Sequence, residues 1–562
     1  MKPSEREEKE ITLSPQSESV ERNAEVPRQS QSASLSPSEL EQFHMHGQDI
    51  AWLLADRATK RGDHPALIWA PRDGEGRQWT YTELDHDVRR VAAGLADRGV
   101  RLGDHVLIHA DNCPEMVLAW LACAVVGAVA VTTNTKSVSH EIASFIARTD
   151  CVGAITQPRY AAAVSGASDS LRWVVVTEDN SGEAPAAGEA DHGLEAYASL
   201  YGEAARWTGR PVDPMLPFCI MFTSGTTSSP KAVVHTHANA IWASRTGPRN
   251  IDLTGNDRYL IYLPFFHVNA QSWSFFPALG VGATVVLTPK WSISQFWTVV
   301  QRHQVTHMSL MPFSMAPLMD PARPSSSLRV GVFGAIIPTG PQMFGLDVYS
   351  AYGMTETVTH AVTGKPTEDL VPGSIGRAAP GYEIAVVDKE TGQLCLDGRP
   401  GELWIRGTRG IQIFLEYFGN PEATADSFHD GWFKTGDVVR TAEGGVVVYV
   451  ERDKDVLKVG GENVSAREVE DVIVAQAAVL KVAVVGKHHD FLNEVPVAFV
   501  VKADQQVDDA ELEKALIEVC ATRLASFKVP RAVYVVEEFP LGTLDKILKN
   551  RLRDMADEQP PV

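Results

Sequence analysis

The sequence predicts an α/β protein with a large N-terminal domain and a smaller C-terminal domain, and three patterns along the chain predict it. From about residue 45 to about 380, short apolar stretches such as "DHVLIHA" alternate with helical patterns. Such repeated units imply parallel or mixed sheets covered by helices. Near residue 380, short strands with turn signals between them, such as "GELWIRG", are typical of a small antiparallel sheet or barrel. After about residue 455, a last group of strand and helix patterns predicts a compact α+β domain.

The elements of the N-terminal domain follow one another in a regular order. "QDIAWLLADRATKRG" has helical spacing, and "HPALIWA" is a strand pattern. "TYTELDHDVRRVAAGLADRGV" opens with Thr80 at a cap position and Glu83 three residues later, so we expect an amphipathic helix there. "PEMVLAWLACAVVGAVAVTTN" predicts a buried helix followed by a strand. Residues 1–44 have few apolar side chains and no periodicity, so we expect a disordered tail.

Length, charge and cysteine content exclude several classes of protein. A chain of 562 residues is expected to form about two to four domains. A net charge of −20 argues against nucleic-acid binding. The six cysteines form no C-x-x-C pair, and no apolar run is long enough for a membrane span. The N-terminus has no apolar signal region, so we expect a cytoplasmic protein.

The stretch "MFTSGTTSSPK", residues 221–231, allows several interpretations. A Walker A loop fails because Pro230 and Ala232 stand where Gly and Ser or Thr belong. An S-x-x-K acyl-enzyme motif needs a helical turn, which Pro230 disfavours. A glycine-containing hydroxyl loop that surrounds a polyphosphate with N–H groups and Lys231 fits, and so does a solvated turn.

Further motifs, in a fixed order, favour the phosphate loop. After "FTSGTTSSPKAVVHTH" come "LPFFHVNAQSW", "YGMTET", "GELWIRG", "WFKTGDVV", "ERDKDVLKVGGENVSAREVE", "ASFKVPR" and "LGTLDKILKNRLR". This set resembles the signature motifs of adenylate-forming enzymes, namely acyl-CoA synthetases, peptide-synthetase adenylation domains and luciferases. It looks closest to bacterial AMP-forming acyl-CoA ligases of the carnitine/crotonobetaine-CoA ligase type. The resemblance covers about residues 45–555, and it implies a small distorted β-barrel and a mobile C-terminal domain.

The resemblance assigns a role to individual residues. It implies that Lys546, Lys231, Thr355 and Glu356 are catalytic, that Glu356 holds Mg²⁺, and that His267 stands at the mouth of the acyl pocket. ATP and coenzyme A would be held by Thr223, Ser224, Gly225, Thr226, Thr227, Tyr352, Asp437, Arg452, Gly460 and Gly461. The acyl pocket would include His267, Asn269, Trp273, Phe333, Gly334, Ala335 and Val358.

The same resemblance implies that one cleft performs two reactions. The core domain (45–452) and the lid domain (453–562) would rotate about a hinge at Lys454. Lys546 would then leave the cleft after adenylation, and Gly460 and Gly461 would enter it for attack by the thiol.

Three departures from the family pattern keep alternatives open. Ser228 and Ala232 stand where Gly is usual, and so does Asp545 beside Lys546. If position 232 needs a positive φ, alanine there is strained. We therefore weigh a complete ligase, which we favour, against an enzyme that only converts a ready-made acyl-adenylate made by a partner enzyme, and against a non-catalytic nucleotide binder. The pocket residues favour a bulky apolar acid over acetate. The sequence shows no carrier domain with an attachment serine, which favours free CoA as the acceptor. The identity of the acid and the oligomeric state cannot be read from the sequence.

Overall fold

The structure is a computed structural model, and it describes residues 37–189, 192–206, 209–223, 230–368, 371–396, 398–452, 456–504, 506–540 and 547–561. Residues 1–36 of the expected tail lie outside this range. The rest of that segment differs from the expectation, because α1 spans Pro37–Gln42 and the neighbouring Leu40 and Phe43 pack against the core. Within the described part of the chain, no helix has the length and apolar character needed to cross a membrane.

Two large sheets build the core domain. The first is nine-stranded, with the order β16 (Arg377–Ala378), β15 (Val362–Gly364), β14 (Asp347–Tyr352), β13 (Val330–Phe333), β12 (His307–Ser309), β10 (Arg258–Ile261), β11 (Thr284–Leu287), β1 (Pro65–Trp69) and β2 (Arg77–Thr80). The second is eight-stranded, with the order β19 (Glu416–Tyr417), β9 (Lys231–Thr236), β8 (Pro217–Thr223), β4 (Val129–Thr132), β3 (His105–His109), β5 (Cys151–Thr156), β6 (Val174–Val176) and β7 (Glu195–Ala196). Both are mainly parallel inside, as the repeated strand–helix pattern predicted.

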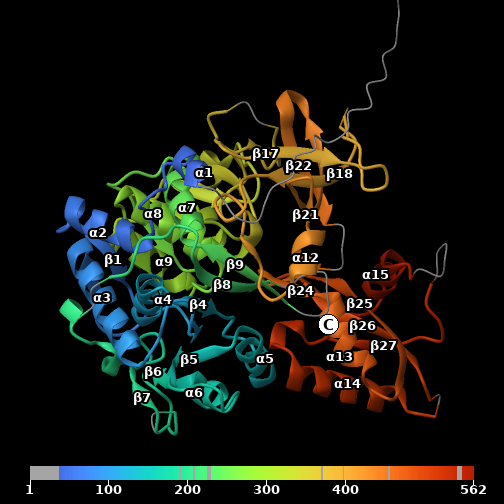
Figure 1. The fold of residues 1–562 in the computed structure, drawn as a ribbon. Helices are drawn as coiled ribbons and strands as arrows, with labels where there is room; N and C mark the ends of the chain where they lie inside the picture. The colour runs from blue at the N-terminus through green and yellow to red at the C-terminus, as the bar shows by residue number, and fades with distance from the viewer. Residues whose placement is uncertain are drawn as a thin grey trace, which may run out of the picture.

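Helices cover these sheets (Figure 1). The α-helices of the core are α2 (Ile50–Arg61), α3 (Tyr81–Asp97), α4 (Pro114–Val126), α5 (Ser139–Thr149), α6 (Pro158–Ser165), α7 (His237–Asn250), α8 (Phe276–Val281), α9 (Ile293–Arg302), α10 (Ala316–Met319), α11 (Gly340–Phe344) and α12 (Pro421–Asp426). The predicted cap of α3 is confirmed: Glu83 N donates to Thr80 Oγ1 at 3.2 Å, and Thr80 N donates to Glu83 Oε2 at 2.8 Å.

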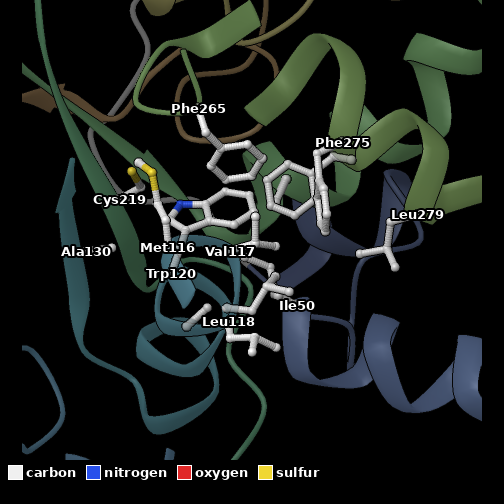
Figure 2. Close-up of a cluster of buried hydrophobic side chains, with 14 of the residues drawn as sticks. Ile50, Met116, Val117, Leu118, Trp120, Ala130, Cys219, Phe265, Phe275 and Leu279 are labelled. Carbon is white, nitrogen blue, oxygen red and sulfur yellow. The ribbon is translucent and has the colours of Figure 1, made fainter. Parts of the chain in front are cut away.

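A single apolar helix, α4, lies at the centre of the core. Its residues from Met116 to Val126 are all buried. Figure 2 shows the indole of Trp120 among aromatic rings, with centroids 5.2 Å from Phe265 and 5.6 Å from Phe275. These edge-on contacts join α4 to the chain that carries "LPFFHVNAQSW". The core therefore directly supports the segment that the resemblance assigns to the acyl pocket.

Two smaller sheets complete the fold and confirm the remaining parts of the fold class. One consists of antiparallel strands β17 (Glu383–Val387), β18 (Gly401–Arg406), β21 (Trp432–Ala442), β20 (Phe428–His429) and β22 (Val446–Arg452). The other forms the C-terminal domain, with β24 (Glu462–Ser465), β23 (Val456–Val459), β26 (Asn493–Lys502), β25 (Val479–His489) and β27 (Val533–Val535). Its helices are α13 (Ala466–Val474), α14 (Asp509–Arg523) and α15 (Lys549–Asp557).

Candidate active site

A cleft of about 1840 Å³ lies between the core and the C-terminal domain. It brings together most of the described residues that the motifs selected. These are Thr223, Lys231, His267, Asn269, Trp273, Phe333, Gly334, Ala335, Tyr352, Thr355, Glu356, Asp437, Gly460 and Gly461. Val358 is fully buried and is not part of the cleft wall. Ser224, Gly225, Thr226, Thr227, Lys454 and Lys546, and the side chain of Arg452, lie outside the described part of the structure.

Lys231 and Glu356 are joined by a residue that the motifs did not indicate. The Lys231 ammonium lies 4.3 Å from the centroid of the Tyr417 ring, and the Tyr417 hydroxyl donates to Glu356 Oε1 at 2.9 Å. Tyr417 reaches this position because β19 pairs with β9 next to Lys231. A cation and a carboxylate thus share one wall of the cleft, which suits phosphates and a hard metal ion. No local pattern in "FLEYFGN" could have indicated this role.

The strand geometry around Lys231 removes one of the doubts raised by the sequence. Lys231 begins β9, and Ala232 pairs with Phe222 in extended backbone. Ala232 is not among the residues with positive φ, so alanine causes no backbone strain at this position. A strand is also not the helical turn that an S-x-x-K motif requires.

A buried histidine fixes the turn that carries Thr355 and Glu356. His235 Nε2 donates to the Thr355 carbonyl oxygen at 2.7 Å. Complete burial lowers the pKa of His235 to about 4, so the ring is neutral at physiological pH. On the other side, Phe414 N donates to the Glu356 carbonyl oxygen at 2.8 Å. The turn is therefore held by β9 and by the segment just before β19, and the motifs did not indicate this role for His235.

Tyr352 and Asp437 also line the cleft, and their side chains contact each other. The Tyr352 hydroxyl donates to Asp437 Oδ2 at 2.6 Å. Asp437 lies in β21 directly opposite Arg452 of β22. The pairing of β21 with β18 is irregular just before Asp437, where Gly436 N donates to Glu402 Oε1 at 2.9 Å and Gly436 adopts a φ of +76°. An aromatic ring and an ionised carboxylate at this spacing can hold a base and the hydroxyls of a ribose.

The part of the cleft that the resemblance assigns to the acyl group, called the acyl side below, is built on a π-helical turn, η3 (Asn269–Phe275), of a type that is frequent at functional sites. Trp273 Nε1 donates to the Val358 carbonyl oxygen at 3.2 Å, and Val358 has a φ of +65°, which is strained for a β-branched residue. A Cβ on Gly353 would lie 2.9 Å from the Trp273 ring, so only glycine admits the indole there. The ring of Trp273 is therefore fixed in place.

The C-terminal domain contributes Gly460, Gly461 and Glu462 at the mouth of the acyl side. His267 Nε2 donates to Glu462 Oε2 at 3.3 Å, and Lys136 Nζ lies 3.1 Å from Glu462 Oε1. Although burial by itself raises the pKa of Glu462, its contacts with His267 and Lys136 lower it to about 2. Neither Lys136 nor Glu462 was selected from the sequence, because their pairing depends on how the two domains meet.

Comparison with known families explains this set of residues. The chain matches the family model of the AMP-binding enzymes over residues 54–418 and that of the AMP-binding enzyme C-terminal domain over residues 468–546. The chain belongs to the AMP-binding enzyme family. The resemblance to the carnitine/crotonobetaine-CoA ligase type is confirmed as well: the crotonobetaine/carnitine–CoA ligase of Salmonella paratyphi A is 32% identical over 526 residues, which cover 90% of this chain and 99% of that ligase.

Solved structures of AMP-binding enzymes show the same fold. The o-succinylbenzoate-CoA synthetase MenE of Bacillus subtilis, a double mutant bound with its product analogue OSB-NCoA, has a TM-score of 0.74 and 29% identity and covers 90% of this chain and 98% of its own. The same synthetase in complex with AMP has a TM-score of 0.61 and 28% identity over 91% of this chain and 100% of its own. This chain is an AMP-forming acid–thiol ligase, for which ATP and CoA are the nucleotide and the thiol.

Proposed function

We propose that this ligase activates a bulky apolar carboxylic acid as its acyl-adenylate and then transfers the acyl group to CoA in the same cleft. In the first step, a carboxylate oxygen bonds to the α-phosphorus of ATP and pyrophosphate leaves. In the second, the thiol sulfur of CoA bonds to the acyl carbon and AMP leaves. The observation that carries this proposal is that Lys231, Glu356 and Asp437 of the core face the same cleft as Gly460 and Gly461 of the C-terminal domain.

The core residues are suited to the first step. Charge gathers on phosphoryl oxygens as pyrophosphate departs, and a preplaced ammonium such as that of Lys231 stabilises it. Glu356 is only 4% exposed and lies on the same wall. The described residues contain no group of three or more His, Cys, Asp or Glu side chains placed for a metal. Mg²⁺ would therefore be held by Glu356 together with the phosphates of ATP, where it would neutralise their charge.

The second step requires the arrangement of the C-terminal domain that is described above. With Gly460 and Gly461 at the acyl mouth, the missing side chains leave room for a pantetheine arm beside the backbone. The higher TM-score with the product-analogue complex of MenE, 0.74 against 0.61 for its AMP complex, supports this interpretation. Reorientation of the C-terminal domain about the segment near Lys454 would then restore the adenylating arrangement with Lys546.

The residues around the acyl side favour an apolar acid. Trp273, Phe333 and Met311 line this part of the cleft. Glu462, a carboxylate of the same cleft, is already paired with Lys136 and in contact with His267. A quaternary ammonium substrate, as in the name of the Salmonella relative, would find no unpaired anion at this place. The preference for an apolar acid is tested with a panel of long-chain, aryl and polycyclic acids together with acetate and carnitine, with the thioesters analysed by mass spectrometry. Equal rates of thioester formation with acetate and with the bulky acids would refute the preference.

The alternative of a thioester-only enzyme rests on Asp545 and Ser228, which the structure does not describe. The extended backbone at Ala232 weakens it, because one of its three supports is gone. Two measurements separate the possibilities. Pyrophosphate exchange with thioester formation supports the complete ligase. Thioester formation only from supplied acyl-adenylate would favour a partner that makes the adenylate, and neither activity would leave a nucleotide binder.

A further inference from the structure

One short segment of the core, residues 134–141, supplies the core partners of two ion pairs with the C-terminal domain. In the first pair the core provides the cation, Lys136, and the C-terminal domain provides Glu462. In the second the signs are reversed, because the core provides Glu141 and the C-terminal domain provides Lys528. Figure 1 shows α5, which carries Glu141, next to α13 and α14. We call these two pairs the crossed pairs.

The second pair is deeply buried. Lys528 Nζ lies 2.6 Å from Glu141 Oε1 and 2.8 Å from Glu468 Oε1. The exposed fractions of the three side chains are 8% for Lys528, 7% for Glu141 and 9% for Glu468. Burial disfavours the charged amine, but the two carboxylates outweigh it and raise the pKa of Lys528 above its ordinary value. The ammonium is thus charged at the domain interface.

Glu141 is held ready for this contact by its own helix. Its second oxygen, Oε2, accepts a hydrogen bond from Val138 N at 3.0 Å, at the start of α5. Glu468 and Lys528 both belong to the C-terminal domain and move together. Any rotation of that domain therefore leaves the Lys528–Glu468 contact intact and breaks the Lys528–Glu141 contact. Only the latter reports on the orientation of the domain.

The reversed signs make the crossed pairs selective for one arrangement. If the C-terminal domain carried only cations at this interface, a shifted arrangement could still pair one of them with the Glu141 carboxylate of the core. With one cation and one anion on each side, a shift brings like charges together or leaves a buried charge unpaired, which is strongly unfavourable. Lys136 reinforces the arrangement because its ammonium also lies 5.2 Å from the centroid of the Phe527 ring, beside Lys528 in sequence.

We propose that Glu141 and Lys528 are positioning residues that hold the C-terminal domain in the arrangement for thioester formation and take no part in adenylation. This inference rests on the proposed two-step function. It assigns the choice between the two half-reactions to a contact between the two domains. Neither residue touches the reacting atoms.

The test compares E141Q with the matched control E468Q in the full chain. Glutamine at 141 keeps the acceptor for Val138 N but removes the charge that crosses the domain interface. We expect the rate of CoA thioester formation from supplied acyl-adenylate to fall about tenfold or more in E141Q, with pyrophosphate exchange within about twofold of the unmodified enzyme. E468Q removes a carboxylate from the same ammonium within one domain, so the ratio of the two half-reactions should stay unchanged.

A double-mutant cycle gives a second test. In a K528M background, E141Q should cause little further loss of thioester formation, because the partner charge is already absent. Equal losses in both half-reactions of E141Q, or unchanged thioester formation, would overturn the inference and leave the proposed function standing. Absence of thioester formation in the unmodified enzyme with every acid of the panel would instead overturn the proposed function, and the inference with it.

Discussion

Replacing Glu462 with glutamine should slow thioester formation and spare adenylation. The substitution keeps the shape of the side chain and its capacity to accept a hydrogen bond from Asn134 Nδ2, which lies 3.2 Å from Oε2. It removes the charge that pairs with Lys136 and His267. All three of these partners belong to the core, so the loss is felt only when the C-terminal domain is docked as described.

The pKa of Glu462 sets the size of this effect. Docking lowers the pKa from 4.5 to about 2. The Glu462 carboxylate is therefore ionised above about pH 5 whether or not the domain is docked, and its contribution to the stability of docking is complete there. This contribution is lost as the pH falls from about 4.5 towards 2. The full pKa shift corresponds to about 3 kcal/mol of free energy that favours the docked arrangement of the C-terminal domain. Since Lys136 is 50% and His267 is 42% exposed, screening reduces this to about 1–2 kcal/mol, which is about tenfold in the docked population.

The assay is single-turnover formation of the CoA thioester from supplied acyl-adenylate at about pH 7.5, with pyrophosphate exchange measured in parallel. K136M, which removes the lysine partner of Glu462, should lose less than E462Q. A loss in E462Q that is the same in both half-reactions would contradict the reasoning, because the proposed adenylating arrangement would lack these contacts. Thioester formation as fast in E462Q as in the unmodified enzyme would also contradict it.

Three further outcomes follow from the structure. D437N should weaken AMP binding by about 1.5–3 kcal/mol, measured by calorimetry, because a charged acceptor for ribose hydroxyls and the Tyr352 hydroxyl becomes neutral; an unchanged Kd would argue against its nucleotide role. W273A should shift the preferred acid towards longer or wider chains in a competition assay, since the fixed indole bounds the acyl side; the same ranking of acids in both proteins would show that another residue sets the limit. W120A should destabilise the core by about 3–5 kcal/mol in urea denaturation, because the ring is fully buried among aromatic side chains; a loss below about 1 kcal/mol would mean that the site repacks.

The motifs predicted the walls of the cleft well because each one places its own residues on a strand end or turn. "YGMTET" and "WFKTGDVV" brought Tyr352 and Asp437 within hydrogen-bond distance although 85 positions separate them. Tyr417 and His235 could not be found this way. Tyr417 depends on the pairing of β19 with β9, and His235 depends on a contact with Thr355, which lies 120 positions away; neither leaves a local pattern.

The contacts between the domains were the least predictable part. "KVGGEN" indicated its two glycines because they suit close approach to backbone, but Glu462 depends on Lys136 and His267, which lie more than a hundred positions away. The same holds for Glu141 and Lys528. The doubt about Ala232 arose because sequence alone did not show that this position lies in an extended strand.

The described cleft residues come from both parts of the chain. Lys231, Glu356 and Asp437 precede residue 453, whereas Gly460, Gly461, Glu462 and Lys528 are among those that follow it. Under the proposed function, the first group selects the carboxylic acid and the second group selects the acceptor. Exchanging residues 456–561 with those of a relative would transplant the acceptor preference and leave the choice of acid in place, provided that residues 134–141 are exchanged to match.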